Sequence, residues 1–152
     1  MSEDLAEILS KQYKDIQADM SHGIRIETLH GNIYKWKVII PGPPETPYEG
    51  GRFPLSIEFL QGFPHVPPKM SFICQMYHPN ISDDGVVPLG DFEEIWKQSP
   101  NIIGLFLYII SLLSDPNCNY AENMDAALTW KTDQREFYRK VKRTIGQSHQ
   151  YI

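Results

Sequence analysis

The sequence has only two cysteines, Cys74 and Cys118, and no apolar stretch long enough to cross a bilayer. Its longest apolar run covers residues 102–113, about twelve residues, whereas a membrane-spanning helix needs about twenty. Two cysteines without ligand spacing indicate neither a secreted disulfide scaffold nor a zinc site. We therefore expect a protein of a reducing compartment, cytoplasmic or nuclear, that does not enter a membrane.

Basic residues are also scarce, with 14 Lys and Arg against 19 Asp and Glu and a net charge of -5. Nucleic-acid binding rests largely on Lys and Arg displacing counterions from phosphates, so nucleic acid is not an expected partner. The acidic N-terminus lacks the apolar core of a signal peptide. The histidines have no ligand spacing with Cys or acidic residues, and we expect no metal and no cofactor.

The chain is long enough to bury a core of its own, and residues 1–152 are predicted to form a single α+β domain. Apolar residues at helical spacing predict an N-terminal helix from Leu5 to Ile16, with Ser2 as a possible N-cap. A second apolar run, Ile102 to Ser114, predicts a central buried helix. Amphipathic spacing predicts one longer helix from Asn123 to Ile145.

Between these helices the apolar period changes to two, which is typical of strands. Four strands are expected, near residues 24–26, 33–40, 53–59 and 70–75, and a turn at Gly31-Asn32 joins the first two. Proline clusters at 41–47 and 63–68 cannot extend a sheet and predict ordered loops. The strands should form an antiparallel meander, followed by a long irregular segment after Met76 that is the expected place of a functional site.

Several motifs and their spacing resemble those of the ubiquitin-conjugating enzyme (E2) family. The resemblance covers nearly the whole chain and rests on Gly42-Pro43-Pro44-x-Thr46-Pro47-Tyr48-Glu49-Gly50-Gly51-x-Phe53, Pro64-x-x-Pro67-Pro68, Tyr77-His78-Pro79-Asn80-Ile81, Trp96 and Asp115-Pro116-Asn117. It implies the UBC-like fold: an N-terminal helix, a four-stranded antiparallel meander, a central helix and C-terminal helices.

In active family members a cysteine stands eight residues after the Asn of His-Pro-Asn and eight before the tryptophan, and it carries the modifier as a thioester. That position is Pro88 here. A proline side chain has no nucleophilic atom, so the resemblance implies that no thioester forms at this position. Pro88 would then serve only as a loop residue with a fixed φ.

Two other positions near Pro88 also differ from the residues usual in active family members. The residue two after the nucleophile, often acidic in active relatives, is Gly90, and the gating position near the incoming lysine falls at Tyr120. The retained motif His78, Pro79 and Asn80 includes an amide that either stabilises an oxyanion, as in active relatives, or holds a loop by hydrogen bonds.

The resemblance also marks two partner-binding surfaces, both altered. Lys11 and Lys14 match part of the helix face that meets the activating enzyme, and they also fit an ordinary solvated helix face. In the ligase-docking loops, His65 replaces an aromatic residue, and Lys97-Gln98 stand where Ser-Pro is usual. A solvated role for His65 is the simpler alternative.

Three functional hypotheses follow. The leading one is a catalytically inactive E2-like protein, similar to ubiquitin E2 variants, that binds an active E2, ubiquitin or a related modifier, or an E3 ligase. The second is an active conjugating enzyme that uses Cys118, although nearby carboxylates would raise the pKa of that thiol. The third is a diverged scaffold that contacts no modifier.

Overall fold

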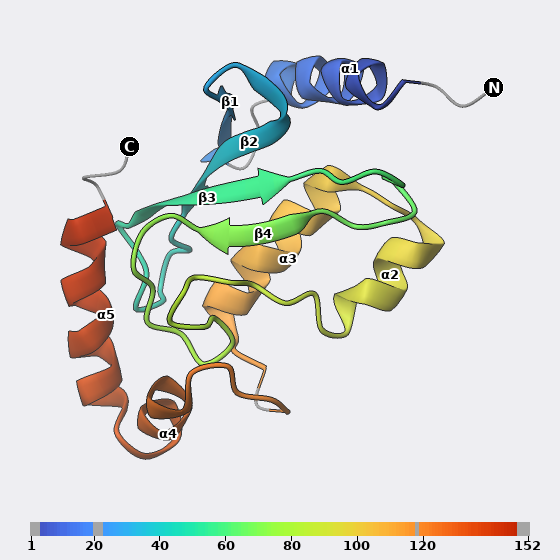
Figure 1. Ribbon diagram of the computed structural model, residues 1–152. Coiled ribbons are helices and arrows are strands. Elements are labelled where there is room, and N and C mark those ends of the chain that lie inside the picture. The colour runs from blue at the N-terminus through green and yellow to red at the C-terminus, as the bar shows by residue number, and fades with distance from the viewer. Residues whose placement is uncertain (1–3, 20–22, 118, 149–152) are drawn as a thin grey trace.

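A computed structural model describes residues 4–19, 23–117 and 119–148 of the chain. Five helices and four strands are present in this part of the chain (Figure 1). In chain order they are α1 (Leu5–Ala18), β1 (Arg25–Leu29), β2 (Asn32–Pro41), β3 (Arg52–Glu58), β4 (Lys69–Phe72), α2 (Phe92–Gln98), α3 (Ile102–Ser114), α4 (Met124–Thr132) and α5 (Gln134–Ser148).

The four strands pair in sequence order and each neighbouring pair is antiparallel, which confirms the predicted meander. The inner face is built from cross-strand pairs such as Val38 with Leu55 and Ile57 with Met70. The first turn falls at His30-Gly31, where both residues have positive φ, one position before the predicted Gly31-Asn32. The α+β fold predicted from the sequence is confirmed.

The fourth strand ends at Phe72 rather than near Gln75 because its partner strand contains a proline. The Ile73 N–H donates to the Pro54 carbonyl at 2.9 Å. Pro54 has no N–H to return to Ile73, so the antiparallel ladder cannot continue past this pair.

The N-terminal and central helices agree with the sequence prediction. The Asp4 side chain caps α1 by accepting the Ala6 N–H at 3.2 Å, while the predicted cap Ser2 lies outside the described residues. Helix α3 runs behind the sheet in Figure 1 and buries six residues, Ile102, Leu105, Phe106, Ile109, Leu112 and Leu113.

The prediction of one helix across residues 123–145 is wrong, because the chain forms two helices separated at Asp133. Asp133 is extended, with φ -150° and ψ 84°, and its side chain accepts the Glu136 N–H at 3.1 Å. It therefore ends α4 and caps α5. The segment after Met76 also contains the short helix α2, which the apolar pattern did not indicate.

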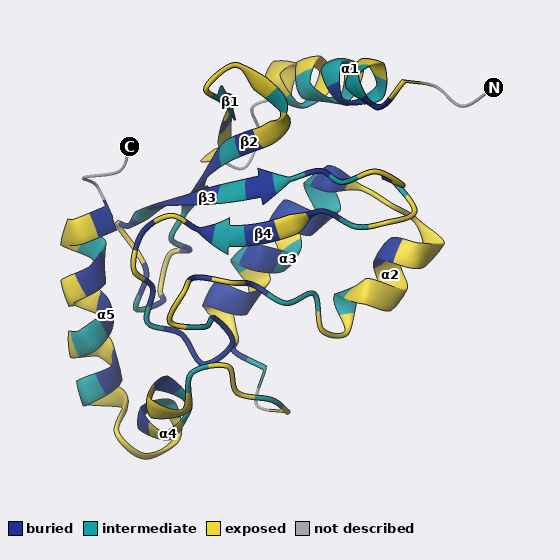
Figure 2. Cartoon of the chain, viewed as in Figure 1, coloured by how far each residue is buried: buried dark blue, intermediate teal, exposed yellow. Residues whose placement is uncertain are grey.

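One side of α5 is buried against the sheet and the other is exposed (Figure 2). Its buried residues are Phe137, Val141, Thr144 and Ser148. Helix α1 lies at the top of Figure 1. Helix α2 lies on the right, near the end of β3 and the start of β4. The core is continuous from α1 through the sheet to α3 and α5.

Candidate functional site

Pro88 follows a segment that is hydrogen-bonded along the free edge of β4. The Phe72 N–H donates to the Gly85 carbonyl at 2.8 Å, and the Val87 N–H donates to the Met70 carbonyl at 3.1 Å. Gly85 has φ +86°, and a Cβ there would lie 2.4 Å from the Phe72 carbonyl oxygen, so this close approach requires glycine. The sheet edge thus fixes the position of Pro88.

Two tyrosines lie against the backbone of Pro88–Gly90. The Tyr108 hydroxyl, from α3, donates to the Pro88 carbonyl at 3.3 Å. A Cβ placed on Gly90 would lie 3.3 Å from the Tyr120 hydroxyl oxygen and 3.5 Å from that of Tyr108. Burial raises the pKa of both phenols, so both are neutral near pH 7. Tyr108 was not singled out from the sequence, where it is hidden within an apolar run.

His78 is fully buried and connects the motif to the end of α3. Its Nε2 lies 2.6 Å from the Leu112 carbonyl, and its Nδ1 accepts the Asn80 N–H at 2.9 Å. The carbonyl needs a donor, so Nε2 carries the proton and the ring is neutral. Burial lowers the pKa of His78 to about 4, and its role in this structure is to hold two segments together.

The Asn80 side chain is fully engaged with the loop that follows α3. Its Nδ2 donates to the carbonyls of Asn117 at 2.9 Å and Tyr120 at 3.1 Å, and its Oδ1 accepts the Asn117 N–H at 2.7 Å. Both amide hydrogens are used, so neither is available to an oxyanion. Next to it, the Pro79 carbonyl accepts the N–H groups of Glu122 and Asn123. The arrangement favours the loop-holding role of Asn80.

Of the two cysteines, the structure describes only Cys74. Cys74 is buried just after β4, and burial raises the pKa of its thiol to about 11, so it is neither accessible nor ionised near pH 7. Cys118, the substitute nucleophile considered from the sequence, lies outside the described residues.

The predicted partner-binding residues are exposed on three separate segments. Lys11 and Lys14 lie on α1, and His65 lies in the loop between β3 and β4. Lys97 and Gln98 end α2, where Lys97 forms an exposed ion pair with Glu94 at 3.6 Å. The indole of Trp96 donates to the Pro64 carbonyl at 2.8 Å, which brings the His65 loop against α2.

A chain of aromatic rings connects the three segments beneath the surface. Successive ring centroids lie 5.3, 4.6, 5.1 and 5.9 Å apart along Tyr13, Trp36, Phe59, Phe63 and Trp96. Tyr13 lies on α1, Trp36 on β2 and Trp96 on α2, while Phe59 and Phe63 lie in the loop that follows β3. Sequence reasoning did not predict this ring chain, because it joins residues from separate parts of the sequence.

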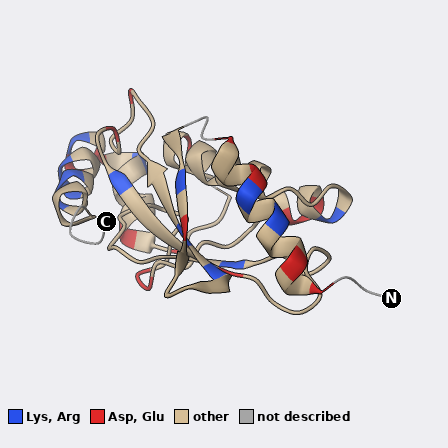
Figure 3. Ribbon diagram, turned by 90° about the horizontal axis from the view of Figure 1, so that it is seen from above, with Lys and Arg blue, Asp and Glu red and all other residues tan. Residues whose placement is uncertain are grey.

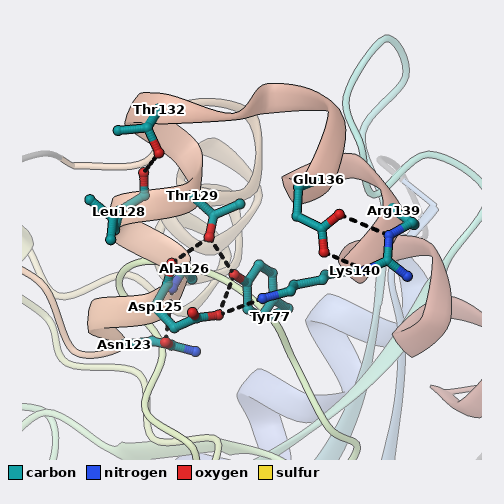
Figure 4. Close-up of polar contacts among 10 residues, drawn as sticks. All are labelled: Tyr77, Asn123, Asp125, Ala126, Leu128, Thr129, Thr132, Glu136, Arg139 and Lys140. Atoms are coloured by element: carbon teal, nitrogen blue, oxygen red, sulfur yellow. Dashed lines mark hydrogen bonds and ion pairs between the residues drawn. The ribbon is translucent and has the colours of Figure 1, made fainter.

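A polar cluster ties α4 and α5 to the segment after β4 (Figure 4). The Tyr77 hydroxyl donates to Asp125 Oδ2 at 2.7 Å and lies 3.0 Å from the Thr129 hydroxyl. Lys140 Nζ pairs with Asp125 at 2.9 Å and lies 5.3 Å from the centre of the Tyr77 ring. This cluster was also not predicted, because its members are up to 63 positions apart in the sequence.

In the part of the chain that the structure describes, no helix is long and apolar enough to cross a membrane. No three His, Cys, Asp or Glu side chains of the described residues gather in a way that could hold a metal ion.

Comparison with known proteins agrees with this architecture. Residues 8–145 match the family model of ubiquitin-conjugating enzymes. The chain is 36% identical over 140 residues to Ubiquitin-conjugating enzyme E2 1 of Caenorhabditis elegans, covering 92% of this chain and 73% of that protein. It is 32% identical to Ubiquitin-conjugating enzyme E2 2 of Trichoderma harzianum, covering 92% and 93% of the two chains.

Two solved structures of ubiquitin-conjugating enzymes are also similar to this chain. The E2 domain of a ubiquitin conjugating enzyme of Toxoplasma gondii superposes with a TM-score of 0.81 at 32% identity, covering 93% of this chain and 96% of that one. A Plasmodium yoelii chain gives a TM-score of 0.85 at 30% identity, with 97% of both chains covered. The match extends over sheet, helices and the segment that holds Pro88, and the chain belongs to the ubiquitin-conjugating enzyme family.

Proposed function

We propose that this protein is a catalytically inactive E2-like member of its family, a binding or regulatory component of a ubiquitin or ubiquitin-like conjugation pathway. The observation that carries the proposal is Pro88, which stands eight residues after Asn80 and eight before Trp96. Thioester formation needs a thiolate, and a pyrrolidine ring supplies no nucleophile.

The surroundings of Pro88 support the same proposal. An incoming lysine must lose a proton, which a carboxylate near the site assists and a neutral phenol does not. The group facing this segment from the loop after α3 is Tyr120, whose pKa is raised by burial. With Asn80 also committed to that loop, three positions that serve the reaction in active relatives have other uses in this chain.

A binding function requires an accessible surface for a partner. A hollow of about 490 Å³ lies on the outer face of the sheet, next to the segment that leads to Pro88. Its lining includes Val86 and Val87, the two residues before Pro88, and the ion pair of Lys35 with Glu58, 3.5 Å apart. The expected partner is an active E2, ubiquitin or a related modifier, or an E3 ligase, in the cytoplasm or nucleus. The E2 variants known as heterodimer subunits lack the last helices, whereas this chain has α5, so a different partner surface is proposed here.

The experiment is a thioester assay with activating enzyme, ATP and a panel of ubiquitin-like modifiers. We expect no reductant-sensitive adduct on the wild-type protein, even at long times. The rival hypothesis of an active enzyme predicts an adduct that disappears in Cys118→Ser and persists in Cys74→Ser. Observing that pattern would overturn the proposal.

The variant Pro88→Cys is the matched positive control, since it restores a thiol at the end of an ordered segment. Its alkylation by iodoacetamide should be faster than that of Cys74, whose pKa is about 11 and whose side chain is buried. In parallel, amide NMR titrations with ubiquitin and with active E2s test the binding role. An absence of shifts with every partner would favour the third hypothesis, a scaffold without modifier contact.

A further inference from the structure

The charges of this chain are distributed unevenly along its length. Six of the 14 basic residues lie within residues 131–143, where only two of the 19 acidic residues occur, so an acidic protein carries one basic region. Blue segments of the ribbon accordingly gather along the helix near the C-terminus in Figure 3, which is α5. The basic residues are Lys131, Arg135, Arg139, Lys140, Lys142 and Arg143.

Helical spacing places most of these cations on one face, which we name the basic stripe: Arg135, Arg139, Lys142 and Arg143. The buried residues of α5, Phe137, Val141, Thr144 and Ser148, occupy the opposite side of the helix. At 100° per residue, positions 135, 139, 142 and 143 all lie within about 60° of the outward direction. The stripe therefore faces solvent along about 12 Å of the helix.

Three of the four cations in the stripe form no ion pair with an acidic side chain of the described residues, although the charge of Arg143 helps to lower the pKa of Glu136. Arg139 pairs with Glu136, whereas Arg135, Lys142 and Arg143 form no ion pair in the described part of the chain. Lys142 lies 5.5 Å from the ring centre of Tyr138, which is 42% exposed beside the stripe. Gln134, Arg135, Glu136, Tyr138, Arg139 and Lys142 line a shallow groove of about 660 Å³.

We propose that the basic stripe is a docking surface for an acidic segment of another protein. Charge complementarity carries this inference, because unpaired cations in a row attract carboxylates, and Tyr138 adds an amphipathic contact of the kind common in protein interfaces. The stripe lies on α5 and shares no residue with the Pro88 segment, which is hydrogen-bonded to β4. The inference therefore stands or falls independently of the proposed function.

Two other polyanions fit the molecule less well. A membrane-bound amphipathic helix inserts its apolar side into lipid, but the apolar side of α5 is already packed against β3 and the core. A long nucleic acid would also meet the rest of the protein, which is acidic because it contains 17 of the 19 acidic residues. A short acidic segment meets only the stripe.

The test is an amide NMR titration of the full chain at low salt with a peptide of alternating Glu and Ala, about eight residues long, which is enough to span the stripe when extended. We expect saturable shifts confined to residues 131–146. Affinity should fall at least about tenfold in Arg135→Glu/Lys142→Glu and weaken with added salt.

Lys11→Glu/Lys14→Glu is the matched control, because it makes the same change in net charge at exposed lysines of another helix. It should bind the peptide like the wild type. An equal loss in both double variants, or no shifts in the wild type, would overturn the proposal. So would tighter binding of a short DNA duplex, or of phosphatidylserine vesicles, through the same α5 residues. Circular dichroism verifies that both variants remain folded.

Discussion

At the scale of single residues, the His78 and Asn80 side chains of the His78-Pro79-Asn80 motif connect segments of the fold by hydrogen bonds. His78 uses both ring nitrogens to connect Leu112 with Asn80. Asn80 uses its whole amide to hold Asn117 and Tyr120, which follow α3. These bonds stabilise the fold whatever residue stands at position 88, so the structural role of the motif does not depend on chemistry there.

The buried His78 makes stability depend on pH. Its folded pKa, about 4, is below the ordinary value of 6.5, so between these values the unfolded chain binds a proton that the folded chain does not. This contribution to stability is complete above about pH 6.5 and is lost as the pH falls toward 4. We expect a loss of about 2 kcal/mol in unfolding free energy between about pH 7 and pH 5.

Urea denaturation at the two pH values measures this loss, and His78→Gln provides the comparison because it cannot titrate. The variant is less stable at neutral pH, yet its stability should change less on acidification than that of the wild type. Equal pH dependence in the two proteins would show that His78 is not the source.

At the scale of elements, helix α4 depends on a few polar contacts with other parts of the chain. Helix α4 is short and amphipathic only to a small degree, with Ala126 and Thr129 as its buried residues. Short helices depend on tertiary contacts for their stability. The cluster of Tyr77, Asp125, Thr129 and Lys140 supplies these contacts (Figure 4).

Removing the hydroxyl in Tyr77→Phe should therefore destabilise the protein by about 1 kcal/mol, the usual worth of a hydrogen bond. Hydrogen exchange should accelerate in α4 more than in β2 or β3. The control Tyr34→Phe removes the hydroxyl of a tyrosine that is 38% exposed and should be nearly neutral. A uniform increase in exchange over the whole chain would contradict a local role for Tyr77.

The fold was largely predictable because its signals are local. Period-two alternation located the strands, and the apolar run located α3. The break at Asp133 has a local signal as well, an aspartate followed three residues later by Glu136, which is a capping pattern that apolar spacing alone overlooks. The site was less predictable, since the contacts of Tyr108 with Pro88 and of Tyr77 with Asp125 join residues that only the folded chain brings together.

At the scale of the whole molecule, α5 completes the core. The ring of Phe137 is fully buried and lies 5.0 Å from Trp130, 5.4 Å from Tyr77 and 6.5 Å from Tyr48, measured between ring centroids. A single side chain from the end of the sequence thus packs against residues from three earlier segments. Removing the Phe137 ring is therefore expected to weaken the packing of all three segments together.

We expect Phe137→Ala to cost about 3–5 kcal/mol, which is a large share of the stability of a typical domain. Its neighbour Tyr138 provides the matched control, since Tyr138→Ala changes an exposed ring of the same helix and should cost less than about 1 kcal/mol. Urea midpoints with unchanged slopes check both values. Similar losses in the two variants would contradict the placement of Phe137 as the residue that closes the core.

The pairing of residues 85–87 with β4 has a consequence for solubility. A strand at the border of a sheet exposes unpaired N–H and C=O groups, which invite other chains to add strands and aggregate. The Gly85 carbonyl and the Val87 N–H occupy such groups on β4, while Arg25 and Glu27 place charges on the opposite border strand β1. The segment leading to Pro88 therefore shields the sheet from self-association, a reason to keep it that does not depend on a nucleophile.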